Sequence, residues 1–320
     1  MTSPKYSIVI PVYNRPQEVE ELLESLTKQV YKNFEVLVVE DGSTITCEKV
    51  FEKYVGKLTI SYFFKPNTGP GPSRNFGFEK AKGEYLVVFD SDCIIPPQYL
   101  EEVELFLMQS PLDAWGGPDR AHTDFTSVQR AMGYTMSSVL TTGGIRGGKS
   151  KDFQPRSFNM GISKAVFQKS GGFKFDRFAE DIEFSIRMKK AGFKIDLIPE
   201  AYVYHKRRAD FRQFYHQVYN FGRGRVLVGK VHPEGIKITH WFPSLFLLGF
   251  VFSVLFLLLS PNLGLLFIGG YGLYFLIIGV HAYLANGSIE VALLSMPAAA
   301  IQLMGYGAGF LREMINPIAK

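Results

Sequence analysis

Two carboxylates one residue apart, in Asp90-Ser91-Asp92, form the strongest chemical signal in the sequence. They directly follow an apolar run, 85–89, that has the composition of a buried strand. Paired carboxylates at a strand end can hold a hard divalent cation, and oxygen ligands select Mg²⁺ or Mn²⁺ over zinc. The alternative is a solvated turn, because this short pattern also arises by chance. The preceding strand favours the metal site, at which a cation would neutralise charge on a departing diphosphate.

Further acidic groups also sit at the borders of predicted elements. Asp41 ends a second apolar run, 34–39, and stands before a glycine, so a simple turn aspartate is its alternative role. Glu180 and Asp181 begin a predicted helix, 180–190, where acids commonly stabilise the helix N-terminus. Each of these carboxylates is a candidate for binding or catalysis.

The elements that must position these groups alternate between strands and helices. Apolar runs typical of strands cover 6–12, 34–39, 58–64 and 85–89, and helical patterns follow the first three, from Gln17, over 47–55 and over 73–82. This alternation predicts an α/β fold with a mostly parallel sheet. Because ligands bind at the carboxyl ends of such strands, we expect Asp41, Asp90 and Asp92 along one edge of the sheet.

Four segments in this order and spacing resemble glycosyltransferase family 2, whose fold is GT-A, a Rossmann-like α/β fold. They are Ile8 to Asn14 (IVIPVYN), Val38 to Ser43 (VVEDGS), Asn67 to Asn75 (NTGPGPSRN) and Gly83 to Asp92 (GEYLVVFDSD). The resemblance covers about the first 230 residues and is densest before Cys93. Each segment alone is weak evidence, whereas the set of four is highly specific.

The resemblance implies roles for individual residues. Pro11, Tyr13 and Asp41 would line the pocket for the nucleotide base, and Arg74 would reach the nucleotide, although a surface arginine at a helix start is the alternative. Asp90 would lie near the ribose and the metal, and Asp92 would bind the metal directly.

The acidic pair after Gly171-Gly172-Phe173 resembles the catalytic base motif of the family. Asp181 would be the base and Glu180 its neighbour. A base on the face of the sugar opposite the leaving group gives a single displacement with inversion. His205, after a strand-like stretch, matches a histidine that helps to bind the metal or diphosphate in some relatives, and a plain strand-end histidine is equally compatible. Arg146 and Lys149, in a glycine-rich loop, are candidates for closing over the diphosphate.

One departure from the family pattern is informative. Processive synthases of the family have a Gln-x-x-Arg-Trp signature after the base, and here Gln217 to Arg225 lacks the tryptophan and the spacing. A polymerising synthase with its own channel is therefore not expected.

The C-terminal part of the chain has the composition of a membrane domain. No Asp, Glu, Lys or Arg occurs between Lys237 and Glu290, and none occurs over 291–311. Spans are predicted near 241–259 and 263–285, joined by a tight link, and a third near 291–311. For the third segment, a re-entrant or interfacial position remains open. Three spans would put Arg312 and Lys320 outside, against the tendency of basic residues to stay inside, but two such residues are too few to decide.

The predicted organisation is a GT-A domain over 1–209, an amphipathic interfacial segment over 210–238 and a membrane domain over 239–320. The segment at 210–230 has an apolar face and several cations, which suits a helix in the headgroup layer or one packed on the domain. The N-terminus lacks the regions of a signal peptide, and the chain has only two cysteines, so we expect the catalytic domain in the cytoplasm on the inner membrane.

These features predict an inverting, metal-dependent transfer of one sugar from a nucleotide-diphosphate sugar to a membrane-proximal or lipid-linked glycan acceptor. The alternative enzyme is a polyprenyl-phosphate sugar synthase, whose acceptor phosphate needs no base. A nicotinamide-dependent oxidoreductase is disfavoured because no G-x-G-x-x-G follows the first strand. A non-catalytic scaffold is disfavoured by the intact acids. The net charge of +5 is too small, and too evenly interleaved, to indicate nucleic acid.

Overall fold

The computed structural model describes residues 3–120, 125–142, 153–206 and 210–316. The chain forms two compact units. The first combines Met1–His122 with Ser150–Lys206, and the second combines Thr123–Lys149 with Arg207–Lys320. Each unit has its own packing and is described by itself.

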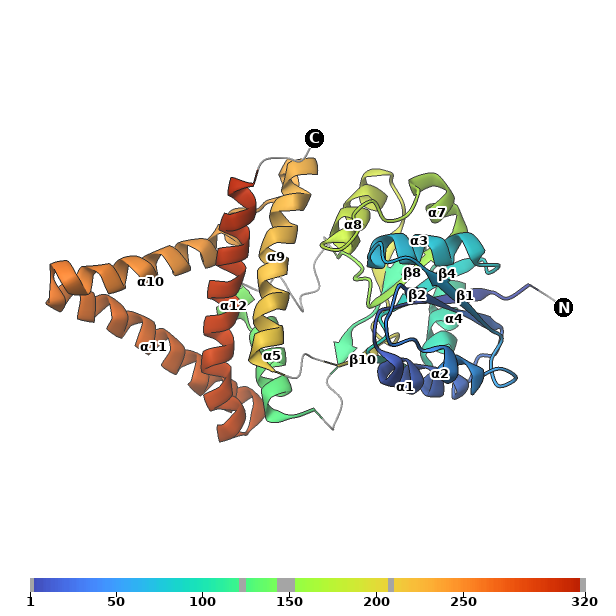
Figure 1. Ribbon diagram of the computed structural model, residues 1–320, viewed down its shortest axis with the longest axis horizontal. Coiled ribbons are helices and arrows are strands. Elements are labelled where there is room, and N and C mark those ends of the chain that lie inside the picture. Colours follow the sequence, from blue (N-terminus) through green and yellow to red (C-terminus); the bar gives the residue numbers. More distant parts are fainter. Residues whose placement is uncertain (1–2, 121–124, 143–152, 207–209, 317–320) are drawn as a thin grey trace. The chain divides into compact units, whose positions relative to one another are not determined.

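The first unit is built on a seven-stranded sheet in the order β3-β2-β1-β4-β8-β6-β9 (Figure 1). Only β8 runs antiparallel to its neighbours, β4 and β6. The predicted mostly parallel α/β sheet is therefore confirmed. The strands are β1 (Tyr6–Val12), β2 (Phe34–Asp41), β3 (Ile60–Lys65), β4 (Tyr85–Phe89), β6 (Ala114–Gly116), β8 (Asn159–Ser163) and β9 (Ile195–Leu197).

Helices cover both faces of this sheet because successive residues of a strand point to opposite sides. One face packs against α1 (Pro16–Thr27), α2 (Glu48–Glu52) and α4 (Tyr99–Gln109). The other packs against α3 (Pro70–Lys80), α7 (Lys164–Ser170) and α8 (Glu180–Lys190). In β1, for example, Ile8 and Ile10 belong to the first core and Val9 to the second. The central strands β1, β2 and β4 are consequently buried from both sides, whereas the edge strands β3 and β9 are only partly covered.

The borders of the predicted helices differ from the observed ones at one functional position. Helix α3 begins at Pro70, three residues earlier than predicted. Proline fits the first turn of a helix because its nitrogen needs no hydrogen-bond partner there. Gly69, with φ of 103°, permits the sharp entry into the helix. By contrast, α8 begins at Glu180 as predicted.

A small second sheet lies beside the main one and consists of β5 (Cys93–Ile94), β7 (Asp119–Arg120) and β10 (Val203–His205). In this sheet His205 pairs directly with Cys93. The small sheet therefore brings the segment after β4 next to the end of β10.

The second unit is helical. It contains α5 (Ser127–Ser137), α6 (Val139–Thr142), α9 (Phe211–Val231), α10 (Phe242–Leu259), α11 (Pro261–Asn286) and α12 (Ile289–Ile315), with two 3₁₀ turns, Pro233–Gly235 and Ile238–Trp241. Three helical segments, 238–259, 261–286 and 289–315, are long and apolar enough to cross a membrane. This length and composition agree with the predicted C-terminal membrane segment. Helices α10 and α11 meet at Ser260 and diverge from it (Figure 1).

Candidate functional site

The end of β2 holds Asp41 in a ring of donors. Lys65 Nζ lies 2.5 Å from Asp41 Oδ1, and the backbone N–H groups of Thr68 and Gly69 each donate to the carboxylate at 2.9 Å. Burial alone would raise the pKa of Asp41, but these hydrogen bonds outweigh burial and hold the pKa below its usual value. Asp41 is therefore an ionised, fixed acceptor at the carboxyl edge of the sheet.

The loop after β1 is tied to the loop after β2. The Asn14 side chain accepts hydrogen bonds from the backbone N–H groups of Thr44 and Ile45, and the Asn14 N–H donates to Ser43 Oγ. Asn14 has a positive φ of 55°, a conformation that asparagine tolerates better than most residues. Tyr13, one residue earlier, is about half exposed. Two of the resembling segments thus form one connected rim.

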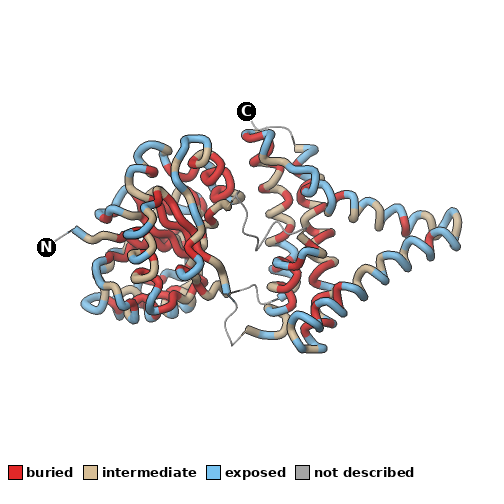
Figure 2. Tube along the Cα trace, turned by 180° about the vertical axis from the view of Figure 1, so that it is seen from behind, coloured by how far each residue is buried: buried red, intermediate tan, exposed pale blue. Residues whose placement is uncertain are grey.

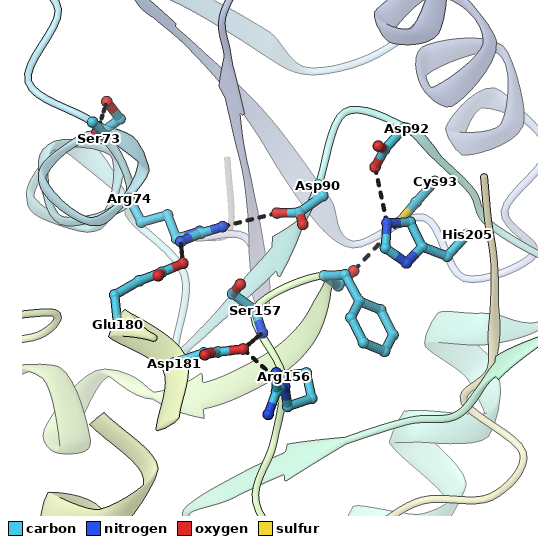
Figure 3. A network of polar contacts seen from close by, with 12 residues as sticks. Ser73, Arg74, Asp90, Asp92, Cys93, Arg156, Ser157, Glu180, Asp181 and His205 are labelled. Atoms are coloured by element: carbon cyan, nitrogen blue, oxygen red, sulfur yellow. Dashed lines mark hydrogen bonds and ion pairs between the residues drawn. The ribbon is translucent and has the colours of Figure 1, made fainter. Parts of the chain in front are cut away.

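Arg74 links two other predicted groups. Its Nη1 donates to Glu180 Oε1 at 2.6 Å and its Nη2 donates to Asp90 Oδ1 at 2.8 Å, and the arginine side chain is only 3% exposed (Figure 3). The two carboxylates raise the pKa of the Arg74 guanidinium above its ordinary value despite burial. Burial, reinforced by Asp181, raises the pKa of Glu180 even though Arg74 opposes that shift. The guanidinium is therefore engaged within the protein, between the metal motif and the base motif.

Asp92 lies between a histidine and an arginine. Its Oδ1 is 3.1 Å from His205 Nε2, and its Oδ2 accepts from Arg15 Nη1 at 2.7 Å. The His205 ring stacks on Phe158 with ring centres 4.9 Å apart. One ligand atom each from Asp92, Cys93 and His205 lies within 4.8 Å of the others. Strand pairing in the small sheet creates this cluster, because His205 and Cys93 are partners in register.

Asp181 faces a short segment before β8. Its Oδ2 lies 3.0 Å from Arg156 Nε and accepts from the Ser157 N–H at 3.4 Å, and its Oδ1 accepts from the Ile182 N–H at 2.8 Å. Figure 3 shows Asp181 near Glu180, which in turn contacts Arg74. The two acids of this pair thus have different partners: Glu180 contacts Arg74, and Asp181 contacts Arg156.

Direct contacts join some of the predicted residues: Arg74 contacts Asp90 and Glu180, and Asp92 contacts His205. The locations of the predicted residues are Pro11 and Tyr13 at the end of β1, Asp41 at the end of β2, Arg74 in α3, Asp90 and Asp92 after β4, Glu180 and Asp181 at the start of α8, and His205 at the end of β10. Arg146 and Lys149, proposed to close over the diphosphate, lie outside the described residues.

Three cations in this network were missed by reasoning from the sequence. Lys65 could have been found, because β3 lies parallel beside β2 and Lys65 is the register partner of Asp41. Arg15 stands directly after the IVIPVYN segment, but the resemblance assigns it no role. Arg156 is preceded by no recognisable motif, and no local signal indicated it.

The donor set around Asp92 fits a divalent cation. Asp92 supplies a carboxylate and His205 an imidazole, and Asp90 lies two residues away with about a third of its side chain exposed. Carboxylate and imidazole groups are ligands that Mn²⁺ accepts, and carboxylates suit Mg²⁺. His205 Nδ1 is buried and has no hydrogen-bond partner among the described residues, whereas His205 Nε2 faces an Asp92 carboxylate oxygen, which can only accept, so this contact requires a proton on Nε2.

Comparison with known sequences identifies the family. The sequence profile described as "Glycosyl transferase family 2" matches residues 7–171, just over half of the chain. An uncharacterized glycosyltransferase of Rickettsia felis is 39% identical over 103 residues, 32% of this chain and 17% of that protein. Another from Haemophilus influenzae is 36% identical over 114 residues, 35% of this chain and 46% of that protein.

A third relative has a described activity. Poly(ribitol-phosphate) beta-N-acetylglucosaminyltransferase TarS of Staphylococcus aureus is 37% identical over 107 residues, 32% of this chain and 19% of that protein. The matched regions therefore span less than half the length of these three curated relatives.

Two solved structures have the same fold. Mannosyltransferase PcManGT from Pyrobaculum calidifontis, in complex with GDP-Man and Mn²⁺, aligns with a TM-score of 0.63 at 17% identity, over 98% of this chain and 88% of that chain. S. aureus TarS 1–349 aligns with a TM-score of 0.51 at 20% identity, over 99% and 93%. These alignments confirm the predicted GT-A fold. With the profile match over residues 7–171, they lead to one conclusion: the chain belongs to glycosyltransferase family 2.

Proposed function

We propose that this protein is an inverting, metal-dependent glycosyltransferase that moves one sugar from a nucleotide-diphosphate sugar to a membrane-proximal or lipid-linked acceptor. The observation that best supports this function is the double contact of Arg74. It joins Asp90, of the predicted metal motif, to Glu180, of the predicted base motif, at 2.8 Å and 2.6 Å. Two motifs far apart in the chain thereby form one polar network, as a transferase requires of its donor and acceptor sites.

The nucleotide is proposed to bind where β1 and β2 end. Pro11 and Tyr13 would contact the base, and Asp41 would accept a hydrogen bond from it. The depressed pKa of Asp41 keeps its carboxylate ionised as an acceptor. Arg74 would contribute by holding Asp90 in place next to the ribose and diphosphate. PcManGT with GDP-Man supports a nucleotide-sugar donor for a chain of this fold, without choosing the base.

Mg²⁺ or Mn²⁺ is proposed to be held by Asp92 and Asp90, with His205 as a further ligand. Such an ion neutralises the negative charge that develops on the departing nucleoside diphosphate. Asp92 is held by Arg15 and His205, so its carboxylate is already oriented when a ligand arrives. The presence of Mn²⁺ with PcManGT supports the choice of a divalent cation.

Asp181 is proposed to be the base. It would take the proton from an acceptor hydroxyl while the acceptor oxygen forms a bond to the anomeric carbon. The bond from that carbon to the diphosphate oxygen breaks at the same time, and the nucleoside diphosphate leaves with the electron pair. Attack from the face opposite the leaving group inverts the anomeric configuration. Glu180 would position the helix start through its contact with Arg74.

A polyprenyl-phosphate acceptor is the second candidate, and Arg156 favours it. This cation lies 3.0 Å from Asp181 and is about a third exposed, so an anionic acceptor would find a positive partner beside the proposed base. A phosphate acceptor is already ionised. Asp181→Asn should then leave transfer largely intact, whereas with a hydroxyl acceptor the same change should reduce transfer by about 10² or more.

The protein is proposed to act on the cytoplasmic face of the cell membrane, with membrane lipids around its C-terminal helices. Residues 1–209 would perform the chemistry, and 210–238 would lie at the interface between water and lipid. Anchoring confines both enzyme and lipid-linked acceptor to one surface, which raises their effective concentration. No nucleic-acid partner is proposed.

The purified full-length protein should hydrolyse one nucleotide sugar slowly in the presence of Mn²⁺ when a panel of donors is screened. Chelation, or Asp92→Asn, should abolish that activity, and Asp196→Asn, on the exposed outer strand β9, should not. Titration calorimetry with uridine and guanosine diphosphates, with and without Mn²⁺, would then identify the nucleotide. Metal-independent hydrolysis, or equal activity of Asp92→Asn, would overturn the proposal.

A further inference from the structure

Helix α12 is apolar but is covered mainly by protein. None of residues 298–311 is exposed, and 44% of the most apolar stretch of this helix is buried, against 11% and 17% for the segments that contain α10 and α11 (Figure 2). Ala298 packs with residues of α5 and α9, and Ala292 and Ala299 pack with residues of α5 and α11. Packing against α5, α9 and α11 therefore accounts for much of the apolar composition of α12.

Helix α9 runs alongside α12 in the same direction. Three glycines mark the close approach. A Cβ on Gly305 would lie 2.9 Å from Val218, one on Gly309 would lie 2.0 Å from Tyr219 O, and one on Gly222 would lie 2.1 Å from Tyr306 O. Residue numbers rise together in both helices, so the helices are parallel and their C-terminal ends lie together.

The shared end of the two helices is joined by charges. Arg223 Nε lies 2.9 Å from Glu313 Oε2, and Lys230 Nζ lies 3.6 Å from Glu313 Oε1. Lys230 also donates to the backbone oxygens of Glu313 and Asn316 at 3.1 Å and 2.9 Å. The end of α12 is thus attached to the end of α9.

Helix α9 is too charged to cross a membrane. Arg223 and Arg225 lie near its middle, where a charged side chain is costly to place at the bilayer centre even when, like Arg223, it has an ion-pair partner. Arg212 and Lys230 add further charge towards its ends. Because α12 lies along α9 from about residue 298 to its end, α12 cannot cross the hydrocarbon core unless α9 accompanies it.

Helices α10 and α11 have the opposite character. Most of their leucines and phenylalanines are exposed in the described part of the chain, including Leu258, Leu265 and Leu276 at 84%, 62% and 57%. With 18 and 26 residues they are about 27 and 39 Å long at 1.5 Å per residue, which is comparable to the ~30 Å hydrocarbon core. No charged residue lies between Lys237 and Glu290. Their exposed surface is therefore apolar, as lipid chains are, and their lengths are comparable to the thickness of the hydrocarbon core.

We infer that the hairpin of α10 and α11 alone enters the membrane, while α9 and α12 lie along its surface and the end of α12 returns to the side of the first unit, 1–122 and 150–206, which we call the catalytic unit. Phe211, the first residue of α9, follows Lys206 of the catalytic unit by five residues, so the chain can separate them by no more than about 18 Å. The N-terminus and the C-terminus are then on the same side, after an even number of crossings or none. This topology does not depend on sugar transfer.

Cysteine labelling tests the topology. The two natural cysteines, Cys47 and Cys93, are buried, so introduced cysteines can be labelled selectively with a membrane-impermeant maleimide. Ile315→Cys reports the end of α12, where Ile315 is 83% exposed, and Met108→Cys, at 74% exposure, reports the catalytic unit. Sealed membrane vesicles are prepared in the two opposite orientations. Both introduced cysteines should be labelled in one of these preparations, and both should be protected from labelling in the other.

Three results would overturn the inference. Labelling of Ile315→Cys and Met108→Cys in opposite vesicle orientations would show an odd number of crossings. Failure of Ile315→Cys to react in either orientation, while Met108→Cys reacts, would show that the end of α12 is inside the bilayer. Release of the wild-type protein from membranes by alkaline carbonate would show that the hairpin is not inserted.

Fusions to the C-terminus provide a second measurement. If the catalytic unit is cytoplasmic, a fluorescent protein fused after Lys320 should fluoresce, and an alkaline phosphatase fused there should be inactive.

Discussion

Removing Arg74 should destabilise the catalytic unit in a way that depends on pH. Arg74→Met leaves Glu180 and Asp90 without their shared cation while preserving much of the side-chain volume. Asp90 is about a third exposed, so water can partly replace the arginine there. The Glu180 side chain is only 9% exposed, so its carboxylate would be left charged and largely shielded from water. Most of the cost therefore arises at Glu180.

The size of the effect follows from that burial. Removing one partner of a buried ion pair costs about 3–5 kcal/mol. For a domain of roughly 150–250 residues, each kcal/mol lowers the melting temperature by about 2–4 °C, so we expect a loss of about 6–20 °C at neutral pH. Arg74→Met/Glu180→Gln should recover about half of this loss, because the buried charge is gone but an unpaired amide remains. Arg74→Lys should fall between the two, since a single ammonium cannot donate in two fixed directions.

The pH dependence separates lost charge pairing from lost packing. Without Arg74, the pKa of Glu180 in the folded state should lie further above its unfolded value of about 4.3. A carboxyl group with a raised folded pKa costs stability above that pKa, and the cost disappears as pH falls towards the unfolded value. The deficit of Arg74→Met should therefore be large at pH 8 and smaller at pH 5. The deficit of the double variant should be similar at both.

Differential scanning fluorimetry of the detergent-solubilised full-length protein measures all four proteins at both pH values. The reasoning would be refuted if Arg74→Met melted within about 2 °C of wild type. It would also be refuted if its deficit were equal at pH 5 and pH 8, or if the added Glu180→Gln gave no recovery.

Three further predictions concern other contacts. Arg15→Met removes a cation 2.7 Å from Asp92, so Mn²⁺ should bind roughly fivefold more tightly in the absence of nucleotide, at about 1 kcal/mol for an ion pair whose arginine is about a third exposed, as calorimetry or paramagnetic resonance would show. Burial alone would raise the pKa of Asp41, but its hydrogen bonds lower it, so its stabilisation is present above about pH 4 and is lost as pH falls further. Asp41→Asn should accordingly flatten the decline of melting temperature below about pH 4. Gly222→Ala should lower the melting temperature, because its Cβ would meet Tyr306 O, whereas Gly269→Ala, with nothing within 4 Å, should not.

Much of the catalytic unit could be predicted from the sequence because its central strands are buried on both faces. A short, continuous apolar run such as 85–89, bounded by turn residues, is typical of a strand covered on both sides, and the acids that end such runs fall at the same edge of the sheet. The start of α8 at Glu180 was also predictable, since acids favour the first turn of a helix. The positions of the carboxylates are thus set by local patterns that a sequence displays directly.

The partners of those carboxylates were not predictable in the same way. Arg15, Lys65 and Arg156 have long side chains that reach across loops, and a local pattern does not encode their targets. Lys65 is the exception in part, because register with β2 places it beside Asp41. Strand pairing between residues more than 100 positions apart brings His205 to Asp92, and no spacing rule indicates it.

The same limit applies to α12. An apolar stretch of about 20 residues has the same composition whether lipid or protein covers it, so length alone predicted a third span. The glycines at 305 and 309 indicated close packing, but they did not show that the partner was the charged helix α9. With that partner known, the cost of carrying its arginines into hydrocarbon supports the inferred surface position of α12. Packing thus supplies an argument that composition alone does not contain.

The pairing of acids with cations also has a consequence for ligand binding. Asp41 lies against Lys65, Asp92 against Arg15, and Asp181 against Arg156. At the proposed site, a divalent cation on Asp92 would have to compete with the Arg15 guanidinium, and an accompanying diphosphate would offer that guanidinium a new anionic partner. Binding at such a site exchanges one set of ion pairs for another, so little uncompensated charge is created at any step. This exchange favours joint binding of metal and nucleotide over binding of either one alone, because only together do they replace both partners of the pair.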